Sequence, residues 1–280
     1  MRQGHPRSQR NFAWAACAIA LFPMADHAGA GGWPLPPGDG EIIATLSRMQ
    51  ANERTEDRID PATGVPSPYR YRKVELSVYA EYGLTKNLTA IGELAFVNEK
   101  TDLSVGSFRN IGLARIKSGT RYAIGTWEET LFSVQPLLTL HLEDVSDNPA
   151  MIQRGDVDIE LALVLARNEK LFGRDIFAVH EIAWTHTDSG RPDEIRADIT
   201  LGTRPRPGTM LLLKSLNTAA LDPVASEKAY RASKLSLSVV CELSGNSRPG
   251  TALEAGVERL IDGQGTIEDT AFRIALWYRF

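Results

Sequence analysis

Few residues of this 280-residue chain could act as catalytic nucleophiles, bases or metal ligands. Three histidines follow residue 30, namely His141, His180 and His186, and a serine hydrolase would need one of them as its base. No Gly-x-Ser-x-Gly sequence occurs, residues 244–247 are typical of a turn, and residues 186–188 of a polar loop edge. His180 and His186 supply too few ligands to hold a metal ion by themselves. We therefore expect no catalytic residue, no metal site and no cofactor.

Charged residues at alternate positions form a second group that could do chemistry. Asp156, Asp158 and Glu160 are the densest acidic set, and Arg196 and Asp198 alternate in the same way further along the chain. If these side chains line an enclosed interior, they could form a constriction that selects or orients a solute. They could equally pair with one another and close that interior. The full set of predicted interior charges is Asp156, Asp158, Glu160, Arg196, Asp198, Arg109, Arg115 and Arg273.

The elements that position these charges follow from an alternation of apolar and polar residues. Apolar residues occupy every second position in strands that have one apolar face, because successive side chains point to opposite faces. The clearest case is residues 270–280, and the same alternation recurs along most of the chain. It predicts twelve strands, at residues 41–49, 72–82, 88–97, 107–117, 129–141, 155–166, 175–186, 194–203, 208–215, 232–243, 250–260 and 270–280.

The connections between these strands differ in length in a regular way. With both termini on the inner side of a membrane, one set of connections lies outside and includes the long segments 50–71, 142–154 and 216–231. Most connections of the other set, such as 83–87 and 204–207, are short. Transmembrane β-barrels show this asymmetry, and an open sheet edge cannot exist in hydrocarbon. The sequence thus predicts an all-β, antiparallel up-and-down transmembrane barrel of about twelve strands, with a soluble lipocalin-like barrel as the alternative fold.

The N-terminus has the pattern of a secretory signal peptide. Residues 1–10 carry three arginines, residues 12–22 are apolar, and residues 28–30 are Ala-Gly-Ala. We expect cleavage after Ala30, which leaves residues 31–280 as the barrel domain. The apolar run is too short to cross a bilayer as a helix. The net charge of −4 gives the chain no overall basic character, so nucleic acid is not an expected partner.

The chain ends on an apolar face that carries Leu276, Tyr278 and Phe280. A terminal phenylalanine on such a strand resembles the assembly signal of bacterial outer-membrane β-barrels. The tyrosine of this signal is Tyr278; position 78 is a valine, Val78, on the apolar face of residues 72–82, and it is not part of the signal. The resemblance implies a location in the cell outer membrane, among its lipids. It also implies delivery by periplasmic chaperones and insertion by the barrel-assembly machinery.

Two further stretches carry a family resemblance. Residues 32–40 read Gly-Trp-Pro-Leu-Pro-Pro-Gly-Asp-Gly, and residues 82–89 read Tyr-Gly-Leu-Thr-Lys-Asn-Leu-Thr. Together they resemble a group of proteobacterial outer-membrane barrels, some labelled XagA-like and others related to a putative phenol-degradation MetA-pathway family. The resemblance implies fold and location, and it brings no catalytic residues and no substrate.

Three functions are compatible with such a barrel. The leading prediction is passive transport of a small solute, or a role in envelope export, without enzymatic activity. A non-conducting structural or surface-interaction barrel is the alternative, and an outer-membrane hydrolase comes third. The long connection 50–71 is interpreted as a solvated surface loop, with an inward fold that constricts the pore, or binding of a surface glycan, as the alternatives.

Two segments fit the predicted barrel poorly. Pro136 cannot donate a backbone hydrogen bond, so we expect a bulge or a break there. Residues 107–117 place Arg109 and Arg115 on one face with Ile111. We assign that whole face to the interior, because an arginine in lipid near mid-bilayer costs about 2–4 kcal/mol.

Overall fold

The computed structural model describes residues 31–54, 70–103, 106–142, 157–171, 174–187, 192–221, 230–244 and 249–280. The predicted signal peptide and most of the predicted 50–71 loop lie outside these ranges. The described residues form twelve β-strands. They are β1 (Gly40–Arg54), β2 (Arg70–Gly83), β3 (Leu88–Leu103), β4 (Gly106–Trp127), β5 (Thr130–His141), β6 (Val157–Leu171), β7 (Arg174–Thr187), β8 (Glu194–Arg206), β9 (Thr209–Ala220), β10 (Arg231–Glu242), β11 (Gly250–Gln264) and β12 (Ile267–Arg279).

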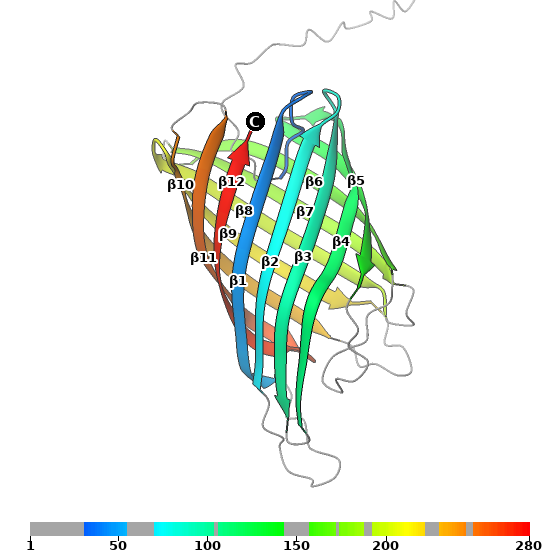
Figure 1. The fold of residues 1–280 in the computed structure, drawn as a ribbon. Coiled ribbons are helices and arrows are strands. Elements are labelled where there is room, and N and C mark those ends of the chain that lie inside the picture. The colour runs from blue at the N-terminus through cyan, green and yellow to red at the C-terminus, as the bar shows by residue number, and fades with distance from the viewer. Residues whose placement is uncertain are drawn as a thin grey trace, which may run out of the picture.

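The strands form one closed barrel in which each strand pairs with its neighbours in the sequence and β1 pairs with β12 (Figure 1). Both seams of β1 are antiparallel, with Ile42 opposite Tyr278 on one side and opposite Ala80 on the other. The predicted all-β, twelve-stranded up-and-down barrel is therefore confirmed. The C-terminus lies at the end of the barrel that carries the tight turns, at the top of Figure 1. We call this end periplasmic and the opposite end extracellular, as in barrels of this kind.

In the part of the chain that the structure describes, no helix is long and apolar enough to cross a membrane.

Apolar side chains cover the outside of the barrel. On β12, Phe272 and Ile274 are 58% and 57% exposed, whereas Ala275 and Trp277 on the inner face are 1% and 4% exposed. The same alternation exposes leucine, isoleucine and valine on the other strands. An exposed apolar surface that runs around the whole barrel is far larger than a soluble monomer tolerates. Lipid, in place of water, is the solvent that fits this surface, which argues against the lipocalin-like alternative.

Residue 78, a valine, belongs to this outer surface and lies away from the C-terminal strand. Val78 is an exposed residue of β2, and it lies opposite Ala44 of β1. Ala44 is opposite Leu276 on its other side, so the whole width of β1 separates Val78 from β12. Val78 therefore does not lie beside β12, the strand that carries Tyr278.

Several segments that we predicted as connections belong to strands in the structure. The predicted 118–128 connection belongs to β4, which ends at Trp127, and only Glu128 and Glu129 form the turn to β5. Both residues have positive φ, 45° and 67°, as a two-residue hairpin turn requires. The ladder between β4 and β5 continues to Trp127 opposite Thr130, so each strand gains its hydrogen bonds up to the turn.

A β-bulge changes the orientation of β4. Phe96 of β3 is opposite Leu113, but the preceding residue Ala95 is opposite Arg115, so Ala114 is an extra residue in β4. One extra residue reverses which side chains face inward beyond that point. Odd-numbered residues of β4 therefore face outward before Ala114 and inward directly after it. An alternation assumed to be regular along the whole segment cannot predict this change.

Pro136 lies inside an unbroken β5, contrary to our expectation of a bulge or a break at that residue. It pairs with Leu161 of β6, while the ladder with β4 has no paired residues between Gly119 and Tyr122. The register on the two sides of this gap is the same. The proline thus interrupts hydrogen bonding with one neighbour and leaves the strand continuous, which is how a sheet accommodates a residue without an N–H.

Candidate channel lumen

Three carboxylates hold one arginine on the inner wall formed by β6, β7 and β8. Arg196 lies 2.9 Å from Glu160, 2.5 Å from Glu181 and 2.6 Å from Asp198. Neighbouring strands bring these residues together, because cross-strand side chains on one face lie within reach of each other. The structure therefore joins the predicted residues Glu160, Arg196 and Asp198. Glu181 was missed, although its alternation with Ile182 would have placed it on the inner face.

A second cluster occupies the inner wall of β2, β3 and β4. Arg115 lies 2.9 Å from Glu75 and 2.6 Å from Glu93, and Glu75 also accepts a hydrogen bond from Lys73. Arg115 comes after the bulge in β4 and faces inward as predicted. Its partner Glu93 lies on β3, which pairs with β4, and its partner Glu75 lies on β2, the next strand beyond β3.

A third cluster follows β10, β11 and β12. Lys234 lies 2.7 Å from Asp269, and Arg273 lies 3.2 Å from Glu254 and donates to the hydroxyl of Ser236 at 2.7 Å. Arg273 thus faces the interior as predicted. In all three clusters a cation contacts carboxylates that lie up to two strands away, so paired charges line these parts of the inner wall.

Asp158 has a partner that the alternation did not reveal. Nε2 of His141 lies 2.6 Å from a carboxylate oxygen of Asp158 at the extracellular end of β5 and β6. Nδ1 of His141 has no hydrogen-bond partner among the described atoms. A histidine–carboxylate couple is part of a hydrolase site, but no serine or threonine hydroxyl in the described ranges bonds to this histidine. Asp156, the third predicted acidic residue, lies outside the described residues.

Arg109 does not lie in the lumen, contrary to our expectation. It is opposite Lys100 and donates from Nε to the side-chain oxygen of Asn98 at 3.3 Å on the exposed face. Ile111, on the same face, is 61% exposed. The bulge in β4 separates these residues from Arg115, so two arginines that share a parity in the sequence face opposite sides of the wall.

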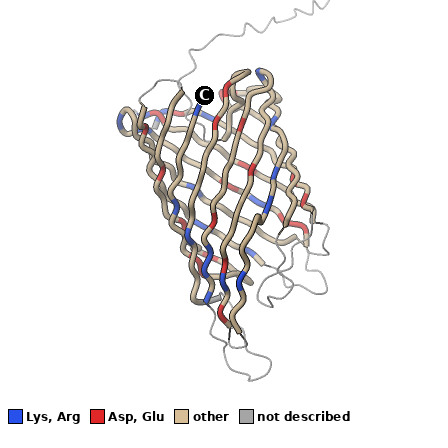
Figure 2. The backbone as a smooth tube through the Cα atoms, in the orientation of Figure 1, with Lys and Arg blue, Asp and Glu red and all other residues tan. Residues whose placement is uncertain are grey.

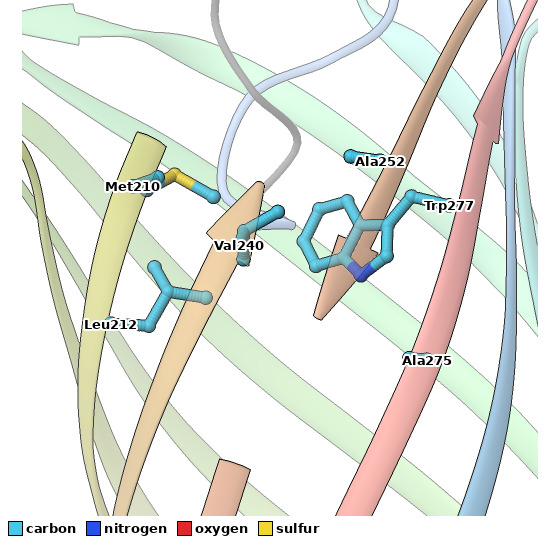
Figure 3. Close-up of a cluster of buried hydrophobic side chains, with 6 residues drawn as sticks. All are labelled: Met210, Leu212, Val240, Ala252, Ala275 and Trp277. Atoms are coloured by element: carbon cyan, nitrogen blue, oxygen red, sulfur yellow. The ribbon is translucent and has the colours of Figure 1, made fainter. Parts of the chain in front are cut away.

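One part of the interior at the periplasmic end is apolar. Met210, Leu212, Val240, Ala252, Ala275 and Trp277 form a buried cluster on the inner faces of β9 to β12 (Figure 3). The indole N–H of Trp277 donates to Glu254 at 3.0 Å, and the guanidinium of Arg279 lies 5.5 Å from the centre of the Trp277 ring. The alternation of residues 270–280 placed Ala275 and Trp277 on the inner face, but it did not show that they pack against β9 to β11.

Residues 31–39, which we call the N-terminal segment, pack against the inner wall at this end. Trp33 packs edge-on against Phe177, with ring centroids 6.0 Å apart, and against a buried cluster that includes Val164 and Val179. The backbone N–H of Leu35 donates to the Thr89 hydroxyl at 3.1 Å.

The approach of this segment to β2 depends on a glycine. A Cβ atom on Gly83 would lie 2.1 Å from the carbonyl oxygen of Pro36, so any side chain at Gly83 would displace the segment. Gly38 also donates its N–H to the carbonyl of Gly83 at 2.9 Å. The segment is therefore held both by hydrogen bonds and by the absence of a side chain.

A cavity of about 270 Å³ lies between the charged clusters and the N-terminal segment. Gly31 forms part of its lining. Equal numbers of acidic and basic residues line it, namely Glu93, Glu160, Glu181 and Asp198, and Lys117, Arg121, Arg196 and Lys214. Its volume is close to the lower limit for pockets that hold small molecules. This cavity is thus a small polar chamber beside the N-terminal segment.

Solved structures of outer membrane barrels resemble this fold. An outer membrane channel from Pseudomonas putida F1 superposes over 90% of this chain and 98% of that chain, with a TM-score of 0.59 and 12% sequence identity. The translocator domain of the autotransporter NalP from Neisseria meningitidis covers 88% and 90%, with a TM-score of 0.51 and 12% identity. The NanC porin covers 85% and 98%, with a TM-score of 0.50 and 9% identity. At such identities the similarity concerns the fold alone.

No protein family model matches the sequence, and no curated protein is significantly similar to it. The resemblance to the XagA-like and MetA-pathway-related barrels therefore stays a prediction. A closed antiparallel barrel with an apolar outer surface and a charged interior is the architecture of transmembrane β-barrels. The chain therefore has the fold of a transmembrane β-barrel, similar to that of solved outer membrane barrels.

Proposed function

We propose that this barrel is a passive channel for a small solute and has no enzymatic activity. The observation that supports the proposal is the polar cavity inside the barrel, where charged side chains of both signs line a chamber next to the N-terminal segment. Fixed charges at a narrow point select solutes by charge and orient them. Because the lining carries both signs in equal number, a zwitterionic or neutral polar solute fits it better than a strongly charged one.

The N-terminal segment narrows the proposed path at the periplasmic end. Trp33 and Phe177 fill space there together with the apolar cluster around Trp277. This filling also supports a second candidate function, a non-conducting barrel with a structural or surface-interaction role. The two functions differ in a single measurable property, which is the passage of ions and small solutes.

Conductance in planar lipid bilayers tests the proposal. We expect the purified wild-type barrel to give discrete current steps, and a variant that lacks residues 31–36 to give larger ones, because Trp33 no longer fills the periplasmic end. Each preparation must first show the gel shift of a folded barrel when it is not heated. The absence of current from both folded proteins would overturn the channel and favour the non-conducting barrel.

A further inference from the structure

Five exposed cations gather on the outer surface of β1 to β4, toward the extracellular end. We call this group the basic patch, and it consists of Arg48, Arg70, Arg72, Lys100 and Arg109. In Figure 2, blue segments, with red segments among them, mark the lower parts of the front strands where the patch lies. These side chains share their faces with apolar residues that point away from the lumen, so they belong to the outside of the barrel.

The register of the strands places three of these cations side by side. Arg72 is directly opposite Lys100, and Lys100 is directly opposite Arg109. Like charges in directly opposed positions on one face destabilise a sheet, because their Cβ atoms are only about 4.5–5.5 Å apart. A row of this kind across three strands is costly in the absence of an anion.

The described carboxylates compensate only part of this charge. Asp102 lies 2.8 Å from Lys100 and 3.8 Å from Arg72, and it also accepts a hydrogen bond from Ser107. Within the described ranges, no carboxylate forms an ion pair with Arg48, Arg70 or Arg109. Glu268 on β12 is exposed too, but it is separated from β2 by the whole width of β1. The patch thus keeps an excess of positive charge.

An apolar surface adjoins the basic patch on its periplasmic side. Val74 follows Arg72 on the same face of β2, and Ile111 follows Arg109 on the same face of β4; their side chains are 41% and 61% exposed. Phe96, on the strand between them, is 51% exposed. The patch therefore lies where the lipid-facing surface ends and the extracellular region begins, at the depth of the outer-leaflet headgroups.

We propose that the basic patch binds the phosphate groups of a phosphorylated glycolipid in the outer leaflet, the chemical class of lipid A. Its acyl chains would lie along Val74, Phe96 and Ile111. Guanidinium groups bind phosphate oxygens through paired, charge-assisted hydrogen bonds, and clusters of basic residues at a membrane surface recognise anionic headgroups. An amphiphile matches both halves of this surface, one cationic and one apolar, and it removes the repulsion within the row.

Native mass spectrometry of barrels refolded without lipid tests the proposal, with bisphosphorylated lipid A as the probe. We expect R72Q/K100Q/R109Q to bind it at least about tenfold more weakly than wild type, because several charge-assisted hydrogen bonds are lost. The charge-conserving variant R72K/K100R/R109K should stay much closer to wild type. The matched control, R167Q/R174Q/R231Q, removes three exposed arginines elsewhere on the barrel and should bind as wild type does.

Parallel titrations distinguish the sources of phosphate. Dephosphorylated lipid A should bind more weakly than the bisphosphorylated form, and inorganic phosphate should not displace the bound lipid. Equal binding of phosphatidylglycerol would show a general anionic-lipid surface and overturn the glycolipid assignment. Equal binding of lipid A by the triple variant and by wild type, or equal losses in the triple variant and the control, would overturn the basic patch as the site.

A second measurement applies if the triple variant does not refold. Binding of lipid A to the wild-type barrel should weaken as sodium chloride is raised, because salt screens exposed charges. The single variant K100Q should reduce this dependence on salt. Binding that is insensitive to salt in both proteins would overturn the proposal. Bilayer conductance is a separate readout, so failure of the lipid site and failure of the channel remain distinguishable.

Discussion

At the scale of single residues, the lumen is organised by cations that each contact more than one carboxylate. Arg196 is the clearest case, since it bonds to Glu160, Glu181 and Asp198 from three strands. A charged pair that is largely removed from water contributes little net stability, but removal of one partner leaves the other charges uncompensated. The cation therefore determines the net charge of the cavity as well as the local stability of the wall.

Replacement of Arg196 by glutamine should make the lumen selective for cations. The substitution leaves three carboxylates without their shared partner and should lower the free energy of unfolding by about 1–3 kcal/mol, since the arginine is partly exposed. The reversal potential in a potassium chloride gradient measures the first effect, and urea unfolding in detergent measures the second. R167Q, which removes an exposed arginine on the outside of β6, serves as the control and should change neither value. An unchanged reversal potential in R196Q would contradict the role of this cluster in the conducting path.

At the scale of elements, the last strand closes the barrel through its final residue. Phe280 exchanges two backbone hydrogen bonds with Gly40 of β1, at 2.8 and 2.9 Å, and its ring stacks on Tyr278 with centroids 5.8 Å apart. A Cβ on Gly40 would lie 2.3 Å from the Phe280 ring, so the glycine leaves room for that ring. The predicted assembly signal of Leu276, Tyr278 and Phe280 thus lies beside the seam where the barrel closes.

Deletion of Phe280 should reduce the yield of folded barrel in the outer membrane about tenfold, much more than the burial of one exposed ring accounts for. The reason is that the assembly machinery is expected to read this residue before the seam forms. Quantitative blotting of outer membrane fractions measures the yield. F272A, which truncates a phenylalanine on the same face of β12, is the matched control and should assemble normally. A normal yield after deletion of Phe280 would contradict its role in an assembly signal.

At the scale of the whole molecule, the barrel wall separates an apolar outer surface from an interior that has a charged part and an apolar part. The apolar outer face suits lipid, and paired charges line much of the lumen. Apolar side chains and the N-terminal segment fill part of its periplasmic end. Gly83 controls the fit of that segment, because Pro36 approaches it so closely. The position of the segment can therefore be changed without altering the lumen charges.

The substitution Gly83→Ala should displace the N-terminal segment and raise single-channel conductance toward that of the variant without residues 31–36. The new methyl group would overlap the carbonyl of Pro36, whereas the charges around Arg196 stay in place. Gly112→Ala is the control, because a Cβ there meets no atom within 4 Å. If both alanine variants conduct like wild type, the segment does not limit the current.

The sequence by itself determined the fold class, the number of strands and the face of most side chains. These properties are local, since the direction of a side chain in a strand depends only on its position in the alternation. The alternation therefore predicted that Glu160, Arg196 and Arg273 face the lumen.

Only the tertiary structure decided which residues meet. The bulge at Ala114, which turns Arg109 outward, depends on the register with β3, and register is set by pairing between strands and not within one. The partners of Arg115 and His141, the packing of Trp33 inside the barrel and the row formed by Arg72 and its neighbours all require segments that are distant in sequence. Because such contacts form only when strands pair and pack in a particular register, the alternation within one strand does not predict them.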